Sequence, residues 1–243
     1  MQLFWWMGPL FKIAGLFAIC TALKTFELVI PDGKRYRSSE EIDFDPLVAP
    51  RELVAFLLEA HGSTLESIRL DFHHFYSLRD LEIIEEIEES GQNMETCDYT
   101  YMSFRESETL KHIHIEFEKL VVLRHLPASL VSLILDHCHF PDLDHDYLNQ
   151  LLRLKEAWCP AIESVTVRGW EWTMEDTDAM LEYAWPLKAH IVVGEKETTF
   201  SFSNIGYQLQ IQFRRAFHSE LPEHHLEPSR RDSTWVDSDD DWL

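Results

Sequence analysis

The sequence predicts an α/β solenoid in which short parallel strands alternate with helices. A strand-like pattern, apolar at positions x, x+3 and x+5 with polar residues between them, recurs along the chain. Stretches with the apolar spacing of amphipathic helices lie between several of these strands. Short turns join the two kinds of element. Repetition of helix, turn and strand builds a solenoid in which each unit packs on its neighbours.

The recurring pattern predicts five parallel strands. It begins at residues 23, 65, 110, 130 and 162, in the segments LKTFELVI, LESIRLDF, LKHIHIEF, LVSLILDH and IESVTVRG. A leucine-rich repeat adds an apolar residue at x+10, after an Asn or Cys at x+8. Four of the segments have the x+10 residue, and residues 130–140 fit the whole template with Cys138 at x+8. We therefore expect a leucine-rich-repeat-like solenoid, or horseshoe, with irregular repeats and with helices on its convex side.

Helical spacing marks residues 9–22, 50–61, 78–89, 144–158 and 173–185. The second of these has Pro50 at its start and Gly62 just past its end, as helices favour. The fourth begins with Asp144. Residues 31–49 and 90–107 lack periodicity, so we expect loops at the edge of the solenoid.

The end of the chain differs from the repeats. Apolar residues alternate with period two at 189–193 and at 199–213, which predicts two or three closing strands. Residues 218–243 contain proline breaks and end in the acidic run DSDDDWL. The predicted organisation is a solenoid over residues 1–217 followed by a disordered acidic tail over residues 218–243.

The first 30 residues are strongly apolar, which raises the question of a membrane segment. Lys12 ends the first apolar run after residues 3–11, whereas a membrane-spanning helix needs about 20 apolar residues. No basic residue precedes that run, as a signal peptide would require. We expect a buried helix followed by a strand, and the alternative is a membrane anchor at residues 1–23. An apolar helix at this position also leads us to expect that neighbouring structure is missing, so that the chain is either a fragment or a gene product whose upstream part has been lost.

Composition narrows the class of partner and the compartment. The 21 basic and 43 acidic residues give a formal net charge of -22, which disfavours nucleic acids and anionic membranes. The four cysteines form no C-x-x-C pair, which favours a reducing compartment, either cytoplasmic or nuclear. We expect a monomer that binds another protein.

The helix–LxxLxL units resemble the leucine-rich-repeat-like region of fungal F-box proteins, above all in LPASLVSLILDHCHF and CPAIESVTVRGW. The resemblance covers roughly residues 9–217. It implies a module that captures a protein substrate and that acts as a ubiquitin-ligase adaptor through an upstream F-box. The usual Leu-Pro-x-Glu opening of an F-box is absent from this sequence.

Residues at x+4 and x+6 of stacked parallel strands share the concave surface. These rows contain Arg69, Asp71, His114, Glu116, Asp136 and Arg168. Three carboxylates would then lie in adjacent strands about 5 Å apart and repel one another unless a cation neutralises them. The functional hypothesis is a docking face for a basic segment of a partner protein. The alternative is an ordinary solvated strand face.

Residues 136–146 suggest a second hypothesis, a metal site. The segment contains His137, Cys138, His139 and His145 together with several carboxylates, and Zn²⁺ binds all of these ligand types. The repeat frame instead explains Cys138 as a buried structural residue, so we assign no metal and no cofactor. The sequence contains no G-x-S-x-G, H-E-x-x-H or phosphate-binding loop motif. We therefore predict a binding protein rather than an enzyme, with no catalytic residues.

Overall fold

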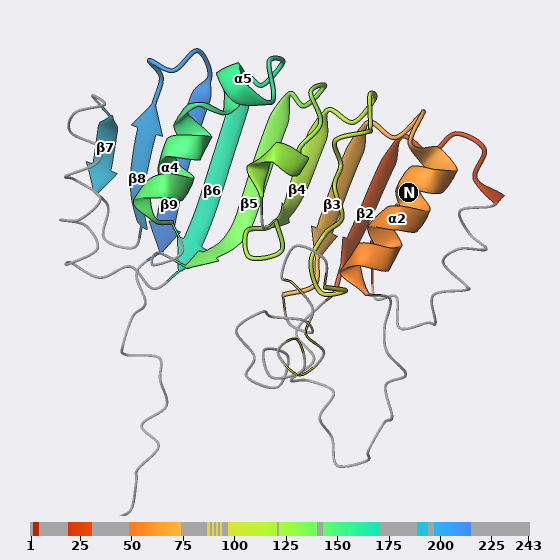
Figure 1. The fold of residues 1–243 in the computed structure, drawn as a ribbon. Coiled ribbons are helices and arrows are strands. Elements are labelled where there is room, and N and C mark those ends of the chain that lie inside the picture. The colour runs from red at the N-terminus through yellow and green to blue at the C-terminus, as the bar shows by residue number, and fades with distance from the viewer. Residues whose placement is uncertain are drawn as a thin grey trace, which may run out of the picture.

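The strands of the computed structural model form a single open, mostly parallel sheet (Figure 1). The structure describes residues 2–4, 19–30, 49–73, 87, 89, 91, 93, 97–120, 122–139, 143–170, 189–193 and 197–214. Within these residues nine strands follow the order β1-β2-β3-β4-β5-β6-β9-β8-β7. They are β1 (Gln2–Phe4), β2 (Thr25–Val29), β3 (Ser67–Asp71), β4 (His112–Glu116), β5 (Ser132–His139), β6 (Ser164–Trp170), β7 (His190–Val193), β8 (Glu197–Phe202) and β9 (Gln208–Arg214).

Strands β1 to β6 pair in parallel in chain order, and β9 is also parallel to β6. Strands β7 and β8 then run antiparallel to their neighbours. After β6 the chain thus passes to the outer edge of the sheet, where it forms β7. It then returns through β8 to β9, which pairs with β6. The predicted α/β class with parallel strands is confirmed, and so are the closing strands.

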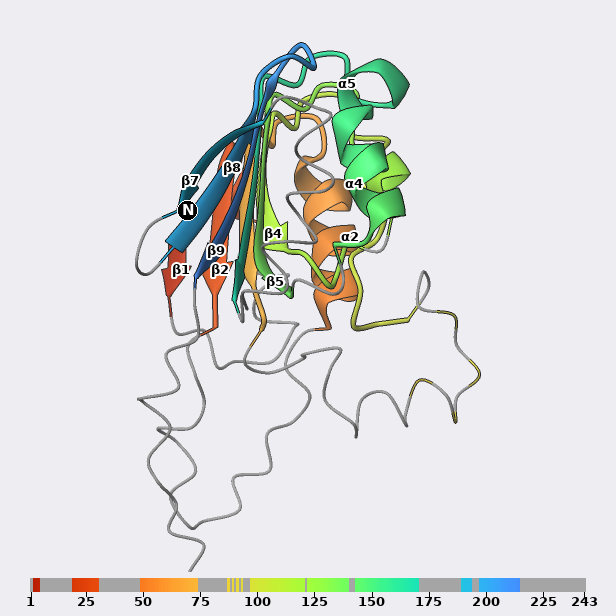
Figure 2. The same cartoon turned by 90° about the vertical axis from the view of Figure 1, so that its left-hand side faces the viewer.

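The helices among the described residues are α2 (Pro50–His61), α4 (His145–Leu152), α5 (Leu154–Ala157) and the short 3-10 helix η2 (Leu123–His125). Figure 2 shows α2, α4 and α5 on the same face of the sheet. Helix α2 has the predicted bounds. The predicted helix over residues 144–158 is instead divided at Arg153, and the Asp144 side chain caps its first half by accepting the Tyr147 backbone N–H at 2.7 Å.

Each of the five predicted strands forms, and each begins two residues after the start of its apolar pattern. Strand β1 was not predicted, because a continuous apolar run fits a helix equally well. The predicted helices at residues 9–22, 78–89 and 173–185, the loop at 31–49 and the tail at 218–243 lie wholly or mostly outside the described residues. Residues 97–107 contain no helix or strand, as expected for a loop.

The apolar pattern is buried in rows that cross the sheet. Position x is occupied by Leu23, Leu65, Leu110, Leu130 and Ile162, position x+3 by Phe26, Ile68, Ile113, Leu133 and Val165, and position x+5 by Leu28, Leu70, Ile115, Leu135 and Val167. Every one of these side chains is buried, and they form one core cluster with the apolar residues of α2 and α4. The rows are continuous because the strands pair in register, so that equivalent positions stand side by side.

A repeated hydrogen-bond ladder joins the bends that precede the strands. The x+1 carbonyls of Lys24, Glu66, Lys111 and Val131 each accept two backbone N–H groups from the next repeat, at 2.8–3.2 Å. A hydroxyl side chain at position x−1 adds a second ladder. Thr64, Thr109 and Ser129 donate to the position-x carbonyls of Leu23, Leu65 and Leu110 at 3.1, 2.9 and 2.8 Å. Each of these side-chain bonds contributes about 1 kcal/mol.

Candidate functional site

The face of the sheet opposite to the helices is the candidate site. None of the described helices covers it (Figure 2). Side chains alternate along a strand, so burial of x+3 and x+5 on the helix side turns x+2, x+4 and x+6 to the other side. We call this surface the open face. Besides Glu116, which is described below, its residues are Thr25, Glu27, Val29, Ser67, Arg69, Asp71, His112, His114, Ser132, Ile134, Asp136, Ser164, Thr166, Arg168, Gln208, Gln210 and Gln212.

Ion pairs and hydrogen bonds link neighbouring strands across the open face. Arg69 Nη1 lies 2.6 Å from Glu27 Oε1, and His112 Nδ1 lies 2.8 Å from Ser132 Oγ. Asp136 contacts His114 Nε2 with one oxygen, and its other oxygen lies 3.5 Å from Arg168 Nη1. These cross-strand contacts hold the side chains in fixed positions before any partner arrives.

The structure brings the three predicted carboxylates, Asp71, Glu116 and Asp136, together toward the carboxyl ends of β3, β4 and β5. They differ in how deeply their side chains are buried. Glu116 stands opposite Asp136 in register, yet its side chain is fully buried. It accepts hydrogen bonds from the backbone N–H of Phe72 and the hydroxyl of Tyr101, and Lys119 Nζ lies 4.0 Å away. Burial raises the pKa of Glu116, and the charge of Asp71 raises it further. Glu116 therefore organises the fold beneath the surface and does not face a partner.

Asp71 and Asp136 stay near the surface, and each has partners within the protein. Burial raises the pKa of Asp71, but the hydrogen bond and charge of His137 outweigh it, so that the net pKa is lowered. The pKa of Asp136 is also lowered, because His114 and Arg168 outweigh the effect of burial. The predicted repulsion among carboxylates is thus relieved by histidine and arginine side chains of the chain itself.

His137 occupies an unusual position in this network. The register of β5 shifts between Leu135 and Cys138, and His137 adopts a positive φ of 59° in this bulge. The bulge carries its ring to Asp71 of β3, with Nε2 3.4 Å from Oδ2, and stacks it on His73 at a centroid distance of 4.0 Å. Burial lowers the pKa of His137, but Asp71 raises it above the ordinary value. Backbone strain of this kind is concentrated at functional sites.

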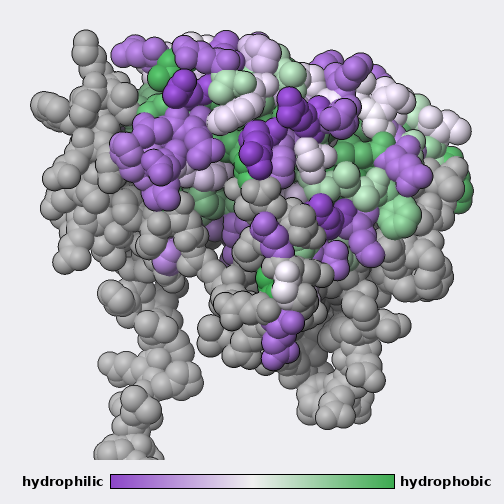
Figure 3. Space-filling view, in the orientation of Figure 1, coloured by the Kyte–Doolittle hydropathy of each residue, from purple (hydrophilic) through white to green (hydrophobic). Residues whose placement is uncertain are grey.

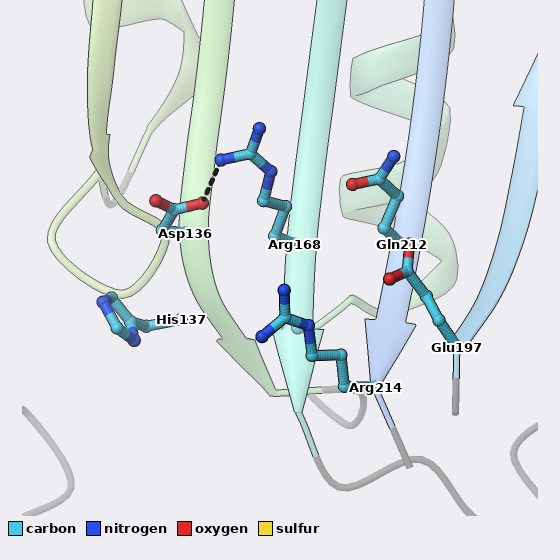
Figure 4. A pocket seen from close by; sticks show the side chains of 7 residues that line it. Asp136, His137, Arg168, Glu197, Gln212 and Arg214 are labelled. Carbon is cyan, nitrogen blue, oxygen red and sulfur yellow. Dashed lines mark hydrogen bonds and ion pairs between the residues drawn. The ribbon is translucent and has the colours of Figure 1, made fainter.

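A pocket of about 370 Å³ opens on the same face, at the carboxyl ends of β5, β6 and β9. Figure 4 views it from the side opposite to the helices. Its lining comprises Asp136, His137, Arg168, Gly169, Glu197, Gln212 and Arg214. Two of the predicted site residues, Asp136 and Arg168, belong to it. Glu197, Gln212 and Arg214 were missed, because no local signal in the sequence shows that β9 pairs with β6.

The arrangement of the described residues does not support the metal hypothesis for residues 136–146. Among the described residues, no group of three or more His, Cys, Asp or Glu side chains could hold a metal ion. Cys138 is buried and its Sγ lies 3.5 Å from the His139 carbonyl, while His145 is exposed on α4. The structural role that the repeat frame gives to Cys138 agrees with this burial.

The opposite, helix-covered face is mostly hydrophilic, with hydrophobic residues showing between polar ones in small groups (Figure 3). Within the described parts of the chain, no helix combines the length and apolar character that crossing a bilayer requires. Comparison of the sequence with protein-family models, with curated proteins and with solved structures finds no match.

Proposed function

We propose that this chain is a protein-interaction module with a leucine-rich-repeat-like solenoid fold, similar to the substrate-recognition region of F-box proteins. The observation that carries the proposal is the open face, where six strands present polar side chains that cross-strand contacts hold in place. A broad, pre-arranged polar surface suits recognition of a protein segment, because little side-chain entropy remains to be lost on binding.

The two ladders that join successive repeats support the solenoid part of the proposal. Equivalent positions make equivalent bonds at three consecutive junctions, from the β2 repeat to the β5 repeat, although the lengths between repeats differ. A solenoid requires this property, because each unit contacts its neighbours in the same way. The intervening helices then vary without disturbing the sheet.

The exposure of the charged side chains favours an acidic rather than a basic partner segment. The side chains of Arg69 and Arg168 are 45% and 48% exposed, whereas those of their partners Glu27 and Asp136 are 11% and 22% exposed. The arginine side chains are therefore more accessible to a partner than the carboxylates that they neutralise. A basic segment would compete with these arginines, while carboxylates and carbonyls of a partner would meet exposed hydrogen-bond donors.

The experiment is affinity capture from a cell lysate followed by mass spectrometry, comparing two variants with the wild-type chain. His112→Glu/Gln208→Glu adds carboxylates at exposed positions of the open face, and Ala60→Glu/Asn149→Glu adds them at exposed positions on α2 and α4. We expect the first variant to lose the captured proteins and the second to keep them, with both retaining the wild-type circular dichroism. Recovery of ubiquitin-ligase adaptors would support the F-box resemblance. Equal capture by all three chains would contradict the proposal.

A further inference from the structure

The pocket between β6 and β9 lies at a break in the strand order. Strands β1 to β6 are adjacent in chain order, and the next neighbour of β6 is β9. The parallel strands β5, β6 and β9 all end at this pocket with their carboxyl termini (Figure 4). In open α/β sheets, ligands bind beyond the carboxyl ends of the strands where the strand order changes. A volume of about 370 Å³ also lies within the range of small-molecule sites.

Two arginines from neighbouring strands line this pocket. Arg168 stands opposite Gln212 in the β6–β9 register, and Arg214 follows two residues after Gln212 on the same face. In Figure 4 the Arg214 side chain rises from the end of β9 toward β6, next to the base of Arg168. The Arg168 guanidinium is directed toward Asp136, and the Arg214 guanidinium lies near the base of Arg168, so the two groups border the pocket at different points (Figure 4). Guanidinium groups and amides are suitable donors to carboxylate and phosphate oxygens.

The two acidic residues of the lining have contacts within the protein. Asp136 contacts His114 and Arg168 with its two oxygens. Glu197 stands opposite Arg214 in the β8–β9 register, and one of its oxygens lies 3.5 Å from Thr199 Oγ1. Asp136 thus occupies only part of the donor capacity of Arg168, whose side chain is 48% exposed. The ring of His137, which also lines the pocket, is directed toward Asp71 of β3.

We propose that this pocket binds a small oxyanion, a carboxylate or phosphate group, between Arg168 and Arg214, with Gln212 as an additional donor. The group belongs either to a free metabolite or to an acidic side chain of a partner. The inference does not depend on the protein-binding function, because a pocket of this size accommodates a free ligand.

The test is isothermal titration of the intact chain with succinate, with inorganic phosphate and with a short acetylated Asp/Glu peptide, at constant ionic strength. Arg168→Gln and Arg214→Gln should each weaken binding about tenfold, because each removes a charged hydrogen bond. Glu197→Gln should tighten binding about threefold, because it removes a repelling charge. Arg153→Gln, an exposed arginine at the end of α4, should bind as the wild type does.

The three probes distinguish the sources of the group. Binding of succinate or phosphate assigns the pocket to a free ligand, and binding of the peptide alone assigns it to a partner side chain. Melting temperatures of the variants show whether each has kept its fold, and loss in both arginine variants with unchanged melting supports the site. Absence of binding by all three probes would overturn the proposal, as would affinities that neither arginine variant changes.

Discussion

At the residue scale, the pair formed by His137 and Asp71 ties the strained bulge of β5 to the end of β3. The pKa of Asp71 is lowered below 3.8 and that of His137 is raised above 6.5. The stabilisation by this pair is therefore fully present between these two values. It is lost as the pH rises through the folded-state pKa of His137, or falls through that of Asp71.

His137→Asn tests this pair, because Asn tolerates a positive φ while it removes the titrating ring. We expect the substitution to lower the free energy of unfolding by about 1–2 kcal/mol at pH 5.5 and by clearly less at pH 9. Urea denaturation at the two pH values measures the difference. His145→Asn on the surface of α4 serves as the control, with little effect at either pH. An equal loss at both pH values in His137→Asn would contradict the ion pair.

Gly169 is the second residue whose identity the structure explains. A Cβ atom at this position would lie 2.3 Å from Phe213 Cε1 and 2.4 Å from the Cys138 carbonyl oxygen. Gly169→Ala should therefore force β5, β6 and β9 apart and lower the free energy of unfolding by about 2 kcal/mol. Urea denaturation measures the effect, with Ser164→Ala on the same strand as the control. An unfolding free energy equal to that of the wild type would show that Phe213 can move aside at no cost.

At the element scale, the hydroxyl ladder gives equivalent roles to residues that are far apart in sequence. Thr109→Val should lower the free energy of unfolding by about 1 kcal/mol, since it removes the bonds to the Gly62 and Leu65 carbonyls. Ser129→Ala should have a similar effect at the next junction, and the double variant should lose more stability than either single variant. Ser63→Ala, at an exposed turn position, should have little effect. Thermal or urea denaturation of the wild-type chain, the three single variants and the Thr109→Val/Ser129→Ala double variant measures these losses. A double variant as stable as the wild type would rule out the ladder as a source of stability.

Some of these elements are predicted by local patterns in the sequence, and others are not. The apolar rows predicted β2 to β6, because burial of one strand face leaves a local period of two in the sequence. The ladder residues Thr64, Thr109 and Ser129 share position x−1, so their role was detectable as a shared hydroxyl at that position. The division of the helix at Arg153 and the bulge at His137 depend on contacts between distant segments, which no local pattern records.

In the candidate site, too, local patterns predict some features, while others depend on contacts between distant segments. Alternation placed Arg69, Asp71, His114, Asp136 and Arg168 on a shared face. It did not predict that Glu116 would be buried, because Tyr101 reaches it from a loop without periodicity. Alternation also did not predict that Arg214 lies near Arg168. The two residues are neighbours because the chain returns through β7 and β8 and places β9 next to β6.

At the scale of the whole molecule, the closing strands complete the core. Strand β9 pairs along six residues of β6, and Phe200, Leu209, Ile211 and Phe213 are fully buried in the main core. Removal of β7 to β9 would expose this surface together with the hydrogen-bonding edge of β6. Such an edge pairs readily with other chains, so aggregation accompanies the loss of stability.

Two truncations test this role and the predicted domain boundary together. A chain ending at residue 188 should lose cooperative unfolding and aggregate, because its core is incomplete. A chain ending at residue 217 should keep the melting temperature of the full-length protein within about 2 °C, since the acidic segment after it is predicted to add no packed surface. Differential scanning calorimetry and size-exclusion chromatography measure both outcomes. A marked fall in melting temperature of the longer chain would mean that residues 218–243 pack on the sheet and belong to the folded domain.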